Sequence, residues 1–259
     1  MKKFLLLTTL IIYGIMIYVN YLSGTGQING ISAGEVSAMY PTLFTPAGFT
    51  FSIWGLIYIA GLVFIYRLFR MSDETDNTKL FMALTILYIV SCILNISWIY
   101  SWHHYRIWIS EILMIGLLIT LILLYQKVSE KPYQSLGKYL STITPISLYL
   151  GWICIAMVAN TSVLLSSLGW DGSPFTESFW ATLMIIIAAL LNLIILIRKR
   201  DIFFALVFLW AAYGIIMARS EDPINENIWV SRAAIMGMII VFLGILYARF
   251  IRVERSKSS

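Results

Sequence analysis

The sequence predicts an all-α membrane protein built as a bundle of eight transmembrane helices. Apolar residues make up 60% of the 259 residues and charged residues 12%, about half the charged share of a typical soluble domain. Eight apolar segments are long enough to cross a bilayer as helices. The loops between them are short and alternate between rich and poor in lysine and arginine, as the loops of multi-pass membrane proteins do.

Hydropathy places the eight spans along the whole chain. The seventh is the shortest of them. The first also fits a cleaved signal peptide, because Lys2 and Lys3 precede a long apolar run. That run is longer than the apolar core of about 7–15 residues of a signal peptide, so we expect the helix to be retained. The predicted spans are residues 4–21, 49–68, 80–100, 107–125, 143–165, 179–197, 202–217 and 228–250.

The basic residues predict the orientation. Fifteen of the 18 lysines and arginines fall on one side of the membrane under an eight-span count, and only Arg106, Arg219 and Arg232 fall on the other. Positive residues favour the cytoplasmic side. We therefore expect a multi-pass protein of the plasma membrane with both termini in the cytoplasm.

Composition also narrows the classes of function. No loop is large enough for a separate soluble domain, and nothing indicates binding to nucleic acid. Cys92 and Cys154 lie inside apolar runs, where thiols are usually small packing residues. No metal site, catalytic residue or required cofactor is predicted, and the expected partners are the lipid bilayer and a hydrophobic small molecule, with a homodimer as one candidate assembly.

Three spans carry aromatic or amide side chains at helical spacing. In the second, Trp54 and Tyr58 are four residues apart and share a face. Asn95 and Trp98 share a face of the third span. The fifth span repeats the pattern at intervals of four residues. The candidate ligand-binding residues are Trp54, Tyr58, Asn95, Trp98, Trp152, Ala156 and Asn160.

These residues have two readings. A single asparagine in a membrane helix usually bonds to a neighbouring helix, a contact of about 0.6 kcal/mol on average. Two amides and three indoles at similar depth on separate helices favour a pocket in the outer half of the membrane. Flat indole faces suit a planar ligand, and amides would orient it.

Residues 22–44 form the longest segment outside the spans, and loops of this length are often functional lids. A flexible connector is the alternative. Pro41, Pro46 and Phe49 lie where this loop meets the second span, and we take them as candidate lid and entrance residues.

Three further residues lie in or near the turn between the third and fourth spans. His103 and His104 are read as part of a solvated turn. Glu111, one turn inside the fourth span, is expected to pair with Arg106. The sequence shows no relay of buried carboxylates, which argues against an ion-coupled carrier.

The motifs resemble the TspO/MBR family, the tryptophan-rich sensory proteins related to the mitochondrial translocator protein. The resemblance rests on Pro46 followed by Trp54 and Tyr58, on Leu94-Asn95-x-x-Trp98, and on Trp152-x-x-x-Ala156-x-x-x-Asn160, in order, over residues 4–165. It implies a five-helix bundle with a pocket for porphyrins or sterols below the first loop. The predicted domains are a TspO/MBR-like five-helix bundle, 1–168, and an appended three-helix transmembrane unit, 169–259.

The leading function is therefore binding or sensing of a flat hydrophobic ligand, with porphyrin or haem as a candidate ligand rather than a cofactor. One alternative is a transporter of a hydrophobic small molecule. The other is a porphyrin-modifying enzyme, for which the sequence offers no nucleophile–base pair.

Overall fold

The computed structural model is built from α-helices that include the eight predicted spans. It describes residues 1–73, 78–130, 135–220 and 228–257, with side chains up to residue 248. Lys131 and the basic residues from Arg249 onward, which the orientation argument used, lie outside the described side chains. The elements are α1 Lys2–Gly24, α2 Ala33–Ala38, the 3-10 helix η1 Gly48–Ser52, α3 Ile53–Ser72, α4 Thr78–His103, α5 Ile107–Val128, α6 Leu136–Ser167, α7 Glu177–Lys199, α8 Ile202–Ser220 and α9 Ile228–Lys257.

Each predicted span coincides with one of these long helices, so the prediction of an eight-helix membrane protein is confirmed. The shortest predicted span corresponds to α8, which has 19 residues. The predicted spans are shorter than the helices, because each predicted span ends where the apolar run ends. The backbone hydrogen bonds of the helix continue through the polar residues that follow.

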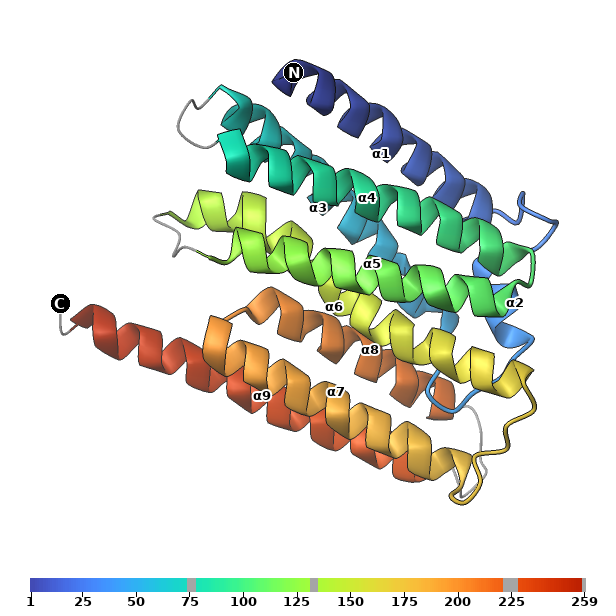
Figure 1. The fold of residues 1–259 in the computed structure, drawn as a ribbon. Helices are drawn as coiled ribbons and strands as arrows, with labels where there is room; N and C mark the ends of the chain where they lie inside the picture. The colour runs from blue at the N-terminus through green and yellow to red at the C-terminus, as the bar shows by residue number, and fades with distance from the viewer. Residues whose placement is uncertain (74–77, 131–134, 221–227, 258–259) are drawn as a thin grey trace. The chain divides into compact units, whose positions relative to one another are not determined.

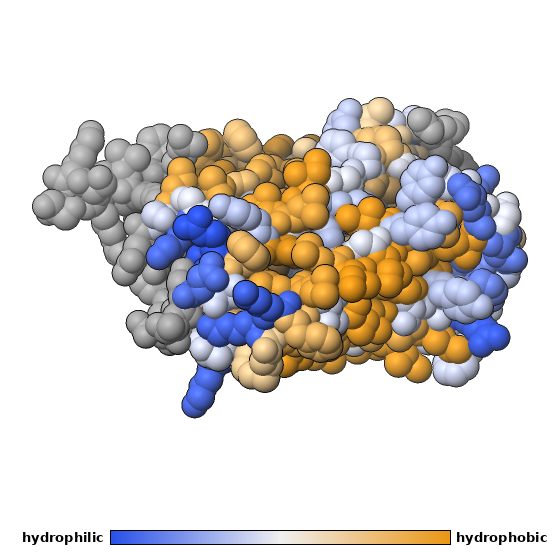
Figure 2. Space-filling view, turned by 90° about the horizontal axis from the view of Figure 1, so that it is seen from above, coloured by the Kyte–Doolittle hydropathy of each residue, from blue (hydrophilic) through white to orange (hydrophobic). Residues whose placement is uncertain are grey.

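The side chains of the long helices show which surfaces face lipid. Large apolar residues such as Ile59, Ile112 and Met236 are more than half exposed, which is costly in water and favourable against acyl chains. In the face drawn in Figure 2, apolar side chains cover the middle stretch of the helices and hydrophilic ones gather towards the helix ends. The chain is a multi-pass integral membrane protein.

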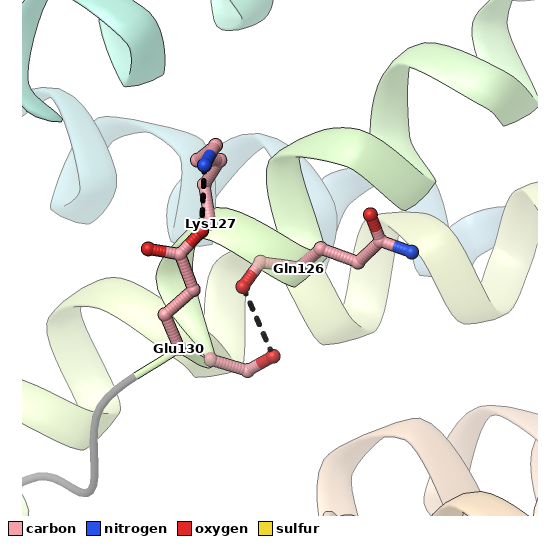
Figure 3. A network of polar contacts seen from close by, with 4 residues as sticks. Gln126, Lys127 and Glu130 are labelled. Carbon is pink, nitrogen blue, oxygen red and sulfur yellow. Dashed lines mark hydrogen bonds and ion pairs between the residues drawn. The ribbon is translucent and has the colours of Figure 1, made fainter.

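Ends of helices carry the polar side chains that meet water. At the end of α5, the Lys127 ammonium and the Glu130 carboxylate form an exposed ion pair with an N–O distance of 2.6 Å (Figure 3). In the same turn, the Ser129 hydroxyl donates to the Gln126 carbonyl at 3.3 Å. Exposed pairs of this kind contribute about 0–1 kcal/mol, so they mark a hydrated helix end rather than a source of stability.

The chain divides into two compact units. The first contains Met1–Tyr40 and Ser52–Ser167, and the second contains Pro41–Phe51 and Leu168–Ser259. The short segment Pro41–Phe51 therefore belongs with α7, α8 and α9, although it lies between α1 and α3 in sequence. The predicted domain boundary falls next to the division at residue 168, and the second unit also takes this segment from the first loop.

Helix packing within the first unit brings α3, α4, α5 and α6 together. α4 packs along α5 and α1, α5 packs along α6, and α3 packs against α6, α1 and α4 (Figure 1). A close approach between α1, α3 and α4 occurs at Gly61, where an added Cβ would overlap the hydroxyl groups of Tyr13 and Tyr88. The Tyr13 hydroxyl donates to the Tyr58 carbonyl at 2.5 Å, so three helices meet around this glycine.

In the second unit, α9 packs along α7 and α8. Gly237 of α9 faces Phe208 of α8 and Ala189 of α7. Gly244 of α9 faces Leu193 and Leu196 of α7. Helix packing in membranes favours such small residues because they let the helices approach closely.

Candidate functional site

Aromatic rings from three helices of the first unit meet around Trp54 of α3. Its ring centroid lies 5.8 Å from those of Tyr58 and Tyr149 and 6.4 Å from those of Trp98 and Trp152. These separations fall in the range at which aromatic pairs attract each other. We call these five residues, Trp54, Tyr58, Trp98, Tyr149 and Trp152, the aromatic cluster.

The local sequence explains how the cluster forms. Trp54 and Tyr58 share a face of α3 because they are four residues apart, and Tyr149 and Trp152 share a face of α6 because they are three apart. Trp98 and Trp152 are buried, whereas Trp54 and Tyr58 are half-buried. α3 therefore supplies the part of the cluster that remains accessible.

Asn160 of α6 holds the edge of the Trp98 indole. Trp98 Nε1 donates to Asn160 Oδ1 at 3.1 Å, and the Ser110 hydroxyl donates to the same oxygen at 3.3 Å. The opposite end of the amide, Asn160 Nδ2, donates to Glu111 Oε2 at 2.5 Å. An indole N–H only donates, so the Asn160 oxygen must face Trp98 and its nitrogen must face Glu111.

The position of Glu111 differs from the sequence-based prediction. Its carboxyl group is buried between α5 and α6, and it also accepts from the Thr161 hydroxyl at 2.7 Å. It does not pair with Arg106, whose side chain is exposed. The prediction was wrong because the i, i+5 spacing suggested a local partner, whereas α6 brings an amide and a hydroxyl within reach. The described part of the protein thus contains a buried carboxyl that the sequence analysis did not foresee.

Asn95 of α4 is buried and lies next to the aromatic cluster. Its side-chain oxygen accepts from Asn20 Nδ2 of α1 at 2.7 Å, which is the interhelical bond that a lone membrane asparagine usually makes. Its own Nδ2 has no hydrogen-bond partner, and neither has the buried Tyr149 hydroxyl. The remaining predicted residue, Ala156, is half-buried on α6.

The loop after α1 packs onto the ends of α4, α5 and α6. Val36 of α2 lies in an apolar cluster with Trp102, Ile107 and Val163, and Trp102 Nε1 donates to the Ala33 carbonyl at 3.1 Å. Trp102 also contacts Trp98, with ring centroids 6.2 Å apart. Residues 25–40 thus form an ordered cover whose main anchor, Trp102, touches the aromatic cluster.

His103 is one of the residues that hold this cover, and the prediction that it lies in a solvated turn was wrong. Its side chain is fully buried, with Nε2 2.7 Å from the Ser23 hydroxyl. Asn29 Nδ2 donates to the His103 carbonyl at 2.9 Å. Burial follows from the loop folding back over the α4–α5 turn, which sequence spacing does not reveal. His104 is half-buried and stacks on Tyr100.

The comparison with protein families agrees with this arrangement. A family model described as TSPO-like protein matches residues 5–247. The chain belongs to the TSPO-like family. The match runs through the last three spans of this TSPO-like chain, beyond residues 4–165, which carry the motifs. Searches among curated proteins and among solved structures give no match.

The candidate lid and entrance residues of this TSPO-like chain lie in the second unit. Ala47 N donates to the Gly214 carbonyl at 3.0 Å, and Phe49 contacts the rings of Trp210 and Tyr213 at 5.5 and 5.8 Å. A Cβ on Gly214 would come within 3.1 Å of Pro46.

This segment is held at both ends. Trp210 Nε1 donates to the Thr50 carbonyl at 2.8 Å. Leu43 N donates to the Glu177 carboxylate at 2.6 Å. Pro41–Phe51 is therefore packed against α8 and tied to α7, and its role as an entrance stays a prediction.

Four residues that the sequence analysis did not select contact the candidate site residues. Tyr149 lies three residues before Trp152, so helical spacing alone could have identified it. Glu111, Asn20 and Trp102 gave weaker signals, because their roles depend on which neighbouring helix they face. Among the described residues, no group of three histidines, cysteines, aspartates or glutamates is placed to hold a metal ion.

Proposed function

We propose that this membrane protein binds a flat hydrophobic ligand, of the porphyrin or sterol kind, against the aromatic cluster. The observation that carries the proposal is the convergence of Trp54, Trp98 and Trp152 from three helices, with ring contacts between them. Aromatic faces flanked by a few polar groups are the usual lining of a small-molecule site. The half-buried rings of Trp54 and Tyr58 are the surface that the ligand would meet.

The residues divide into two roles. Trp54 and Tyr58 would stack on the ligand. Asn160, with Glu111 behind it, would hold the Trp98 indole in one orientation, because both ends of its amide are occupied. Site residues that are fixed by their own hydrogen bonds lose less entropy on binding.

The proposed orientation follows from the positive-inside rule. In the plasma membrane, both termini would lie in the cytoplasm, and the α4–α5 turn with the cover of residues 25–40 would face outward. The ligand would then enter from the outer side. Labelling of single cysteines introduced at residues 30 and 130 with a membrane-impermeant reagent tests this: residue 30 should react in intact cells and residue 130 should not.

The binding experiment uses the purified full chain in lipid nanodiscs. A porphyrin, its dimethyl ester, a sterol and a flat polycyclic ketone are titrated while tryptophan fluorescence and ligand retention are measured, with empty nanodiscs as the blank. At least one compound should bind saturably. Replacement of Trp54 by leucine should weaken its binding about tenfold, since ring stacking adds about 0.5–1.5 kcal/mol beyond the area buried.

Trp108 provides the matched control. It lies on α5 of the same unit and its side chain is mostly exposed, so Trp108→Leu should leave the affinity unchanged. If no compound in the panel binds, or if Trp54→Leu and Trp108→Leu behave alike, binding at the aromatic cluster is refuted.

Transport is the second candidate, and the buried Glu111 carboxyl favours it. Ionisable groups inside membrane helices often belong to proton pathways. Glu111 is connected to the aromatic cluster by hydrogen bonds, because Asn160 bonds both to Glu111 and to Trp98. Flux of a bound compound in liposomes, with and without a proton gradient, separates the two functions: a carrier accumulates the compound and a binding protein does not.

A further inference from the structure

We propose that the start of α7 is anchored in the headgroup layer of the bilayer by an aromatic patch, which consists of Trp170, Phe175, Phe179 and Trp180. The partner of this patch is the lipid surface, and the patch belongs to the second unit. The inference is therefore independent of the proposed function of the aromatic cluster. It follows from the exposure of the rings, the bonds that fix them, and their continuity with the lipid-facing side of α7.

The four rings of the aromatic patch contact one another. Phe175 stacks on Phe179 with ring centroids 4.4 Å apart, and the Trp180 ring lies 5.5 Å from Phe179 and 5.8 Å from Phe175. Trp170 contacts Trp180 at 5.5 Å. These contacts leave Trp170, Phe175 and Phe179 40%, 51% and 42% exposed. The patch thus presents three large rings to its surroundings.

Hydrogen bonds fix the shape of the patch. Trp180 Nε1 donates to the Gly172 carbonyl at 2.7 Å, and Phe175 N donates to the same carbonyl at 3.0 Å. Gly172 has a φ of 88°, a conformation that favours glycine. The Thr176 hydroxyl accepts from Phe179 N at 3.2 Å and caps α7. A surface that is ordered before it meets its partner loses little entropy on contact.

The patch continues the lipid-facing side of α7. The positions 7, 11 and 18 residues after Phe179 lie on the same helix face as this ring. They hold residues that are 45%, 53% and 63% exposed, namely Ile186, Leu190 and Ile197. Phe175 stacks on Phe179 and precedes Glu177, the first residue of α7, so it extends this apolar row beyond the end of the helix. The rings therefore meet the same partner as the row, which is lipid.

The length of α7 places the patch at the depth of the headgroups. Between Glu177 and Arg198 the helix rises about 32 Å, at about 1.5 Å per residue. The hydrocarbon core is about 30 Å thick. When Arg198 and Lys199 lie among the headgroups on one side, Glu177 reaches the boundary on the other. Indole rings are favoured at this boundary, where Trp170 and Trp180 would lie.

The charges near the patch fit an interface without net charge. The sequence has no lysine or arginine between residues 168 and 197. Asp171 Oδ1 accepts from Ser173 N at 2.9 Å, and Glu177 Oε1 accepts from Leu43 N at 2.6 Å, so both carboxylates bond to backbone N–H groups. Contact with lipid then depends on the rings and not on anionic headgroups. Zwitterionic lipid should suffice, and salt should have little effect.

A depth measurement on the full chain tests the proposal. Nitroxide labels are attached to single cysteines at residues 175, 190 and 130 in zwitterionic nanodiscs, with Cys92 and Cys154 replaced by alanine. Collisions with oxygen, which concentrates in the bilayer, and with a water-soluble nickel complex are measured by electron paramagnetic resonance. Residue 190 is the reference for the acyl chains, and residue 130, at a hydrated helix end, is the reference for water. The label at 175 should collide with nickel severalfold less often than the label at 130.

Footprinting provides a second measurement on the unmodified chain. Hydroxyl radicals formed in water oxidise accessible side chains, and mass spectrometry locates the products. Met39 of the cover is 57% exposed and is the reference for a side chain in water. After normalisation to the intrinsic reactivity of each residue type, Trp170 and Phe175 should be oxidised severalfold less than Met39, because lipid covers them.

Variants test whether the rings hold the patch in the interface. Trp170→Ser with Phe179→Ser should raise the nickel collisions of the label at 175 towards those at 130 and leave the label at 190 unchanged, since α7 still crosses the membrane. Phe69→Ser is the matched control. It removes a ring that is 56% exposed on α3 of the first unit, and it should leave the label at 175 unchanged.

Three results would overturn the proposal. The label at 175 could collide with nickel as often as the label at 130, or Trp170 and Phe175 could be oxidised as strongly as Met39. Either result would place the patch in water, where it would be free for a soluble partner. The proposal also fails if the label at 175 is protected only after anionic lipid is added, because charge would then hold the segment instead of the rings.

Discussion

Replacing Gly61 by alanine tests whether the contact of α1, α3 and α4 holds the helix that carries Trp54. A Cβ at this position would overlap the hydroxyl groups of Tyr13 and Tyr88. Overpacking of this kind costs about 1–3 kcal/mol. Displacing the Tyr13 hydroxyl would also break its bond to the Tyr58 carbonyl, which adds about 0.5–1.5 kcal/mol.

One effect opposes these costs. Alanine is favoured over glycine inside a helix by about 1 kcal/mol. Since the steric and hydrogen-bond terms together exceed this gain, Gly61→Ala should lower the free energy of unfolding by about 0.5–3.5 kcal/mol. Unfolding in mixed micelles, followed by circular dichroism or steric trapping, measures the change.

Gly55 on the same helix provides the control, because a Cβ there would have nothing within 4 Å. Gly55→Ala should be neutral or stabilising. Tyr13→Phe and Tyr88→Phe remove the overlapping hydroxyls, so adding them to Gly61→Ala should recover part of its loss. The reasoning is refuted if Gly61→Ala is as stable as the parent chain, or if the added phenylalanines recover nothing.

Three further predictions concern the cover, α2 and the second unit. Trp102→Phe removes the bond to the Ala33 carbonyl, which costs about 0.5–1.5 kcal/mol. Amide exchange of residues 33–38 should therefore speed up by about two- to thirteenfold. Unchanged exchange would show that the bond does not anchor the cover. The Ser32 hydroxyl and backbone N–H hydrogen-bond to Glu35 and lower the pKa of its carboxyl group. The capping box should therefore stabilise α2 at pH values above the ordinary pKa of a glutamate and lose this contribution as the pH falls through the lowered pKa. NMR titration of Glu35 should show a midpoint below that in a Ser32→Ala variant, and equal midpoints would contradict this. In Gly214→Ala, the added Cβ would overlap the Thr50 side chain, which should destabilise the second unit by about 1–3 kcal/mol in thermal unfolding. If this overlap causes the loss, adding Thr50→Ala should recover part of the stability.

The spans could be predicted from the sequence because a membrane helix is a local property. An apolar run of sufficient length has to form a helix in lipid, whatever its neighbours are. The same reasoning succeeded for α8, the shortest span. It placed helix ends less well, since α6 extends seven residues before the predicted start at residue 143.

Part of the candidate site was predictable for the same reason. Helical spacing puts Trp54 with Tyr58 and Asn95 with Trp98, and the rings of Trp54, Trp98 and Trp152 do come together in the first unit. Whether they bind a ligand stays a prediction. The partners of Glu111, His103 and Asn95 depend on how α1, α5 and α6 are rotated about their axes, and a hydropathy pattern does not fix that rotation.

The position of residues 41–51 has a consequence for dividing this protein. These residues reach their partners Glu177, Trp210 and Gly214 only after another 120 or more residues of chain. A fragment that stops at residue 167 would retain every member of the aromatic cluster but would expose Phe49 and leave the Leu43 amide without its acceptor. Co-expression of the missing C-terminal portion as a separate polypeptide should restore these contacts in trans, so complementation between two halves is a more informative dissection than truncation.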